Sequence, residues 1–180
     1  MTDRGTIGDA LRQHYAASGL PADGGRFANA WTLTLGPVCV RLRNFKWRQR
    51  ALLRHDVHHL MTGYECTPMG EMEMAAWEFA AGPFPSVLST AFCLPLVAIG
   101  ALLAPRRCLA AFARGRRSRT LYALPSSADL ASLALSTLRN SFVPVERHSI
   151  TFADLALYGL LVASSAALLV APLAVLSVFR

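Results

Sequence analysis

Charged side chains are scarce in this chain of 180 residues, and acids are the scarcer kind. Asp, Glu, Lys and Arg make up 16% of the residues, whereas about a quarter is usual in soluble domains. There are 11 acids against 18 bases, a net charge of +7, and 53% of the residues are hydrophobic. A disordered, solvating chain needs low hydrophobicity, so this composition excludes one.

Cysteine is also sparse, and the start of the chain lacks an apolar leader. Four cysteines without a Cys-x-x-Cys pair are ordinary usage, which excludes a disulfide scaffold. Residues 1–30 are polar, so we expect no signal peptide. The length then fits one domain, or a small domain with membrane segments.

Long uncharged runs are, by contrast, present twice. Residues 84–104 and 155–179 contain no charged side chain, and a helix needs about 20 apolar residues to cross a bilayer. We therefore expect one or two membrane helices, with the second run as the stronger candidate. Two buried helices of a soluble helical core are the alternative interpretation.

Basic side chains gather in two segments that flank the first run. Residues 41–54 carry six basic groups, and residues 105–119 carry six arginines and no acid. Such segments stay on the cytoplasmic side of a membrane, but a run that crosses once would separate them. We therefore favour a first run that folds back at Pro95 as a re-entrant or in-plane hairpin. No recognition motif accompanies the arginines, so we expect anionic lipid and not nucleic acid as their partner.

The remaining patterns predict a mostly α protein. Helical spacing covers residues 1–20, 46–61 and 126–141, and alternation around a Gly-Pro pair predicts a small β-hairpin over 31–42. Thr67 as N-cap and Pro68 as the first helical residue start another helix, which ends at Gly82. Residues 46–82 therefore form a predicted antiparallel helical hairpin. We divide the chain into a metal-site region (1–83), a membrane or re-entrant helix (84–104), a basic cytoplasmic segment with a short helix (105–154) and a C-terminal transmembrane helix (155–180).

Ionisable side chains concentrate on that helical hairpin. His55 and His59 are four residues apart, so both lie on one helix face and can chelate one metal ion. The hairpin returns Glu71 to the same place, which completes a set of two histidines and one carboxylate for Zn²⁺ or Fe²⁺. Asp56 is a candidate fourth ligand or general base, and Glu78, on the same face as Glu71, is a candidate second catalytic carboxylate.

Two other interpretations of these ionisable residues remain open besides a catalytic metal site. Histidines at a helix C-terminus also interact favourably with the helix dipole, and Glu71 in a first turn is ordinary helix chemistry. His58 lies off the chelating face, so we leave it outside the metal ligands. Four protein ligands, with Asp56 included, would close the site and make the ion structural, whereas a catalytic ion keeps an open position.

The pattern His55-Asp56-x-x-His59, followed by eleven residues and Glu71, resembles the signature of the Coq-four family of ubiquinone (coenzyme Q) biosynthesis proteins. The likeness covers about residues 20–82, and Trp77-Glu78 also resembles bacterial members. It does not cover the two apolar runs, which are unlike the membrane-peripheral core of that family.

The resemblance implies a function at a membrane. A mostly helical protein would bind Zn²⁺ through His55, Asp56, His59 and Glu71, and would handle a polyprenylated quinone precursor. The implied activity is removal of the ring carboxyl at C1 with oxygenation there. The alternative is a non-catalytic lipid-binding or scaffold protein with a structural ion. Membrane lipid, other quinone-biosynthesis proteins and a second copy of the chain are the expected partners, at the cytoplasmic face of a bacterial inner membrane.

Overall fold

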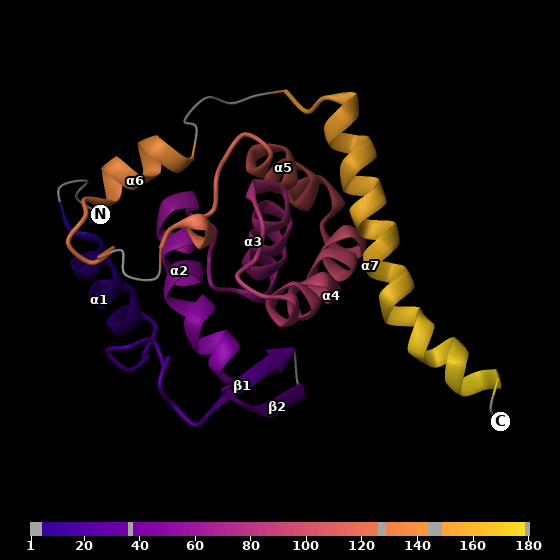
Figure 1. Cartoon of the computed structure of the whole chain (residues 1–180), viewed down its shortest axis with the longest axis horizontal. Helices are drawn as coiled ribbons and strands as arrows, with labels where there is room; N and C mark the ends of the chain where they lie inside the picture. Colours follow the sequence, from indigo (N-terminus) through magenta and orange to yellow (C-terminus); the bar gives the residue numbers. More distant parts are fainter. Residues whose placement is uncertain (1–4, 36–37, 126–128, 144–148, 179–180) are drawn as a thin grey trace.

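The computed structural model describes residues 5–35, 38–125, 129–143 and 149–178. Within these residues the chain forms seven α-helices, one short 3-10 helix and one two-stranded sheet (Figure 1). The mostly α fold is therefore confirmed, with its small β-hairpin. The elements in chain order are α1 (Ile7–Ala17), β1 (Ala30–Leu35), β2 (Val38–Arg43), α2 (Lys46–Thr62), α3 (Pro68–Ala81), α4 (Val87–Leu103), α5 (Pro105–Gly115), η1 (Leu121–Ala123), α6 (Leu135–Phe142) and α7 (Phe152–Val178).

Helix α3 lies at the centre of the body, with α2, α4 and α5 around it (Figure 1). Nine of its 14 residues are buried, including Met74 and Trp77, neither of which has exposed surface. Helix α5 can cross close to α3 because Gly115 has no side chain: a Cβ there would lie 2.3 Å from the backbone oxygen of Trp77. The core therefore depends on small residues at the helix crossing as well as on large ones.

The β-hairpin has the predicted position. Strands β1 and β2 pair antiparallel, with Trp31 opposite Leu42 and Ala30 opposite Arg43. The predicted turn at residues 36–37 lies outside the described residues. The hairpin lies against helix α4, where the ring of Trp31 is 5.8 Å from the ring of Phe92. A lone hairpin is only marginally stable in water, so this contact supports it.

The first apolar run does not fold back at Pro95, and that expectation is wrong. Helix α4 continues through Pro95 from Val87 to Leu103. One proline removes one backbone hydrogen bond, and the packing of α3, α5 and α7 along α4 holds the rest of the helix together. The chain reverses instead at Ala104, whose backbone is non-helical, before Pro105 begins α5. At 17 residues α4 is also shorter than a typical membrane-spanning helix.

The second apolar run forms α7, whose Phe152–Val170 segment is long and apolar enough to span a membrane. The N-terminal half of α7 packs on α4 and α5, and its C-terminal half extends away from the body (Figure 1). Asp154, which has no exposed surface, accepts hydrogen bonds from Arg116 and Arg117 at the end of α5. This charged contact fixes the start of α7 to the body.

The helix predicted over residues 126–141 is shorter than expected. Only Leu135–Phe142 is helical among the described residues of that region, and residues 126–128 lie outside them. The preceding segment pairs with the start of α1, because the carbonyls of Ala131 and Leu133 accept hydrogen bonds from Gly8 and Ile7. This tertiary pairing competes with helix formation, and helical spacing alone does not reveal it.

Candidate metal centre

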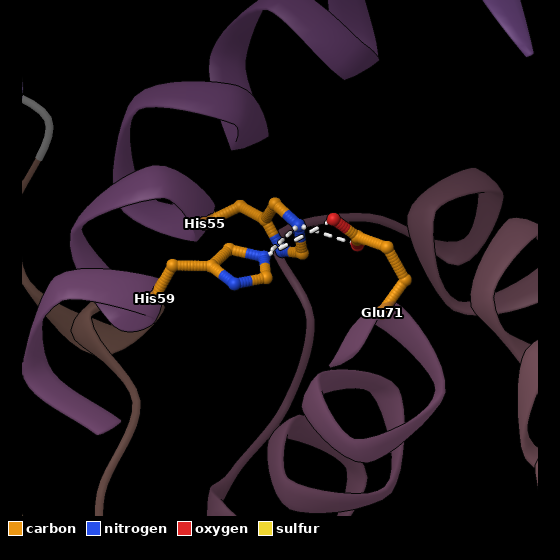
Figure 2. Close-up of side chains that lie close together, drawn as sticks. All are labelled: His55, His59 and Glu71. Carbon is orange, nitrogen blue, oxygen red and sulfur yellow. Dashed lines mark hydrogen bonds and ion pairs between the residues drawn. The ribbon is translucent and has the colours of Figure 1, made fainter. Parts of the chain in front are cut away.

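Three predicted ligands lie together between α2 and α3. Each of His55, His59 and Glu71 offers one ligand atom within 4.8 Å of the others. The Nε2 atoms of the two histidines are 3.1 Å apart, and the Glu71 oxygens lie 3.2 Å from His55 Nε2 and 3.3 Å from His59 Nε2. Figure 2 shows both imidazole rings of α2 directed toward the carboxylate that α3 supplies.

Local sequence accounts for this convergence. A spacing of four residues puts His55 and His59 on one face of α2. Thr67 accepts a hydrogen bond from the Gly70 backbone and caps the start of α3, as predicted, so Glu71 lies in the first turn. Gly70 is needed in this turn, since a Cβ there would lie 1.9 Å from the backbone oxygen of Glu65. The compact turn returns the chain so that Glu71 faces the histidines.

The other ring nitrogen of each histidine has its own acceptor. His59 Nδ1 lies 2.8 Å from the Tyr64 carbonyl oxygen, and His55 Nδ1 lies 3.1 Å from Oε1 of Glu78. Carbonyls and carboxylates only accept, so both Nδ1 atoms carry hydrogen, and the two Nε2 atoms are the ring nitrogens left to bind a metal ion. Metal-binding histidines are held by such contacts, which orient the ring and increase its basicity.

The two Nε2 atoms lie 3.1 Å apart and beside the Glu71 carboxylate, a place where a proton or a metal ion can bind. The pKa values of both histidines also favour a positive charge here. Burial lowers the pKa of His59, but Cys66 and Glu71 outweigh it and raise the pKa to about 9. Burial also lowers the pKa of His55, yet Glu78 and Glu71 raise it well above 6.5. The cluster therefore favours positive charge, and its two imidazoles and one carboxylate could hold a metal ion.

Glu78 joins several groups behind the histidine pair. Its Oε1 lies 3.1 Å from His55 Nδ1, 2.7 Å from His58 Nδ1 and 2.8 Å from the hydroxyl of Tyr122. The Leu121 backbone N–H donates to His58 Nε2 at 2.8 Å, so His58 is neutral and donates from Nδ1. Burial accordingly lowers the pKa of His58. Burial would raise the pKa of Glu78, but His55 and His58 bring it well below its usual value, so a fully buried carboxylate stays ionised.

Asp56 lies beside the cluster and is not among the three residues that converge on one point. Successive helical residues point about 100° apart, which turns Asp56 away from the histidine pair. Its Oδ2 accepts a 2.7 Å hydrogen bond from the Tyr15 hydroxyl of α1. Burial raises the pKa of Asp56, although His55 and Tyr15 partly oppose this.

Sequence reasoning missed two tyrosines at this site. Tyr122 is 44 residues from Glu78 along the chain, and Tyr15 is 41 residues from Asp56. No local spacing links such pairs, so only the fold brings them together. His58 had a local signal, since it neighbours His59, and its absence from the ligand set agrees with its position off the chelating face.

Comparison with known proteins identified no relative of this chain. No protein-family model, curated protein or solved structure matches the chain.

Proposed function

We propose that this chain is a membrane-associated, metal-dependent enzyme of ubiquinone biosynthesis. Its proposed reaction is removal of the C1 carboxyl group of a polyprenylated quinone precursor as CO2, with a hydroxyl oxygen from O2 placed at C1 and the second oxygen atom reduced to water by an external two-electron donor. One observation carries the metal-dependent part: His55, His59 and Glu71 each direct one ligand atom to a common place, within 4.8 Å of one another. The resemblance of their spacing to the Coq-four signature supports the choice of pathway. Zn²⁺ is the proposed ion, with Fe²⁺ as the alternative.

A metal ion held by these residues would act as a Lewis acid toward an oxygen substituent of the ring. Side chains of the protein would orient the metal ligands and transfer the proton. Glu78 orients His55 through Nδ1 and keeps a negative charge behind it. We assign proton transfer to Asp56, because burial raises its pKa and its carboxylate accepts a hydrogen bond from the Tyr15 hydroxyl beside the metal site.

The competing proposal is a scaffold protein with a structural ion. A structural zinc site uses four protein ligands, and Asp56 is the candidate for the fourth. The hydrogen bond from Tyr15 holds Asp56 outside the converging group, so three protein ligands remain among the described residues, and a metal ion held by three ligands would keep an open position. An open position favours the enzyme over the scaffold.

The membrane part of the proposal depends on α7. Leu155, Leu157 and Leu160 are all at least 44% exposed, and together they give α7 an apolar surface of the kind that a bilayer would cover. Arg116 and Arg117 lie at the N-terminal end of this helix. The positive-inside rule then assigns this end of α7 to the cytoplasmic face of the bacterial inner membrane.

Metal analysis and quinone profiling of the same variants test the proposal. We expect His59→Ala and Glu71→Gln to lose the metal and to accumulate a prenylated precursor that retains its ring carboxyl. Glu65→Gln is the matched control, since Glu65 is an exposed acid of the same turn. Loss of the metal with normal quinone pools in both variants would reject the enzymatic role in this pathway.

A further inference from the structure

The two basic segments of the chain differ in what their side chains contact. In the second segment, residues 105–119, five of the six arginines donate hydrogen bonds to other parts of the body. Their acceptors are the carboxylate of Glu73 for Arg107, the carboxylate of Asp154 for Arg116 and Arg117, and the backbone carbonyls of Thr62 and Ser141 for Arg114 and Arg119. Most of this segment therefore holds the fold together.

The first basic segment, by contrast, presents its charge to solvent. Residues 24–55 contain seven basic side chains and no acid. Four of these cations are exposed and form no ion pair among the described residues, namely Arg41, Arg43, Lys46 and Arg50. Positive charge is therefore concentrated here without a carboxylate nearby in the sequence to balance it.

The pleat of the β-hairpin directs two of these cations away from the body. Trp31 lies opposite Leu42 in the ladder and packs on Phe92 of α4, so the face that carries these two residues is the inner one. Successive residues of a strand point to opposite faces. Arg41 and Arg43, on either side of Leu42, therefore project from the outer face of the hairpin.

An exposed aromatic ring lies among these cations. Phe45 is 51% exposed, and the guanidinium of Arg43 lies 5.7 Å from the centre of its ring. Lys46 and Arg50 follow directly on one face of α2, since they are four residues apart. We refer to Arg41, Arg43, Phe45, Lys46 and Arg50 as the hairpin surface. Cations around an exposed aromatic side chain are typical of surfaces that lie on a lipid bilayer.

Helix α7 indicates where a bilayer would lie. Its C-terminal half extends from the body toward the side on which the β-hairpin lies, the lower side of the view in Figure 1. A membrane that takes up this half of α7 would therefore face the hairpin with its lipid head groups. Anionic head groups attract Lys and Arg side chains that lie near the membrane surface.

We propose that the hairpin surface docks on anionic lipid head groups of the membrane that α7 enters. The body would then have two attachments, α7 and the hairpin surface, and two attachments fix its orientation on the bilayer, whereas one helix would leave it free to rotate. The inference rests on the membrane attachment in the proposed function. It adds a second contact and the lipid charge that this contact requires, and it does not depend on the metal centre.

Hydrogen exchange of the full-length chain in lipid nanodiscs tests this inference. One kind of disc contains phosphatidylcholine alone, and the other contains equal parts of phosphatidylcholine and phosphatidylglycerol. We expect amide exchange over residues 38–50 to be slower by about fivefold or more in the anionic discs, and high salt to remove the difference. Arg41→Gln with Arg43→Gln should also remove it.

The matched control is Arg106→Gln with Arg119→Gln, which removes the same charge from exposed positions of the second basic segment. This variant should keep the slower exchange of the wild type. Exchange in α3, at the centre of the body, should be equal in all three proteins, which shows that they are folded.

The outcomes separate this inference from the proposed function. Equal exchange over residues 38–50 in the two kinds of disc would overturn the docking of the hairpin surface and leave the role of α7 standing. Equal loss of the slowing in both double variants would overturn the assignment to the hairpin surface. Failure of the wild type to enter either disc would overturn the inference together with membrane attachment by α7.

Discussion

At the scale of single residues, the two ring nitrogens of His55 have different partners. Nε2 faces His59 and Glu71, whereas Nδ1 donates to Glu78. This division turns an ordinary helical histidine into an oriented ligand, since the Glu78 contact selects which nitrogen carries hydrogen. The spacing of His55, His59 and Glu71 in the sequence predicts the contacts that Nε2 makes. It does not predict that Glu78 also binds His58, because that depends on how α3 is rotated about its axis.

Replacement of Glu78 by glutamine tests this orienting role. The change removes the buried negative charge behind His55 but keeps the shape of the side chain. We expect metal affinity to fall by about 10–100-fold, which competition with a chelator measures. Tyr122→Phe is the control, because it removes one donor to the same oxygen and leaves the charge in place. Wild-type metal affinity in a folded Glu78→Gln protein would contradict the orienting role.

At the scale of elements, the turn between α2 and α3 decides the geometry of the site. The Thr67 cap and Pro68 start α3 where the sequence predicts. The sequence predicts less well where tertiary contacts compete with local preference. Residues 130–134 pair with the start of α1 and do not extend α6, and packing around α4 keeps it continuous through Pro95. Local signals thus place the ends of elements, and packing decides their length.

Gly70→Ala tests the importance of this turn. The added Cβ would collide with the Glu65 backbone oxygen, so the turn must open and move Glu71 away from the histidines. We expect a loss of about 1–3 kcal/mol in unfolding free energy together with weaker metal binding. Gly159→Ala in α7 is the control, since a Cβ there meets no atom within 4 Å. Thermal unfolding and a chelator titration measure both effects, and unchanged values for Gly70→Ala would contradict the argument.

At the scale of the whole molecule, the two apolar runs have different positions. Helix α4 buries Val97 and Ala98 in the body, whereas α7 exposes leucines along Phe152–Val170. Hydrophobicity alone could not separate them, because a buried helix and a membrane helix have the same composition. Length separates them in part, since α4 has 17 residues.

Charges placed on α7 test its role in membrane binding. Leu157→Arg with Leu160→Arg puts two cations on its exposed apolar face, at a cost of about 2.5–3.5 kcal/mol each if that face enters the bilayer. We expect the variant to leave the carbonate-resistant membrane fraction. Gln13→Arg with Ala17→Arg adds the same charge to exposed positions of α1 and should stay with the membrane. Equal membrane retention of both variants would contradict a membrane-spanning α7.

X-ray absorption spectroscopy of the zinc-loaded chain tests the central claim most directly, namely that His55, His59 and Glu71 hold a metal ion with an open position. The account predicts one zinc ion per chain, with two imidazoles and only nitrogen and oxygen neighbours at about 2.0–2.2 Å. Asp56→Asn should leave this spectrum unchanged. A sulfur neighbour at about 2.3 Å, a spectrum altered by Asp56→Asn, or the absence of bound zinc would contradict the account.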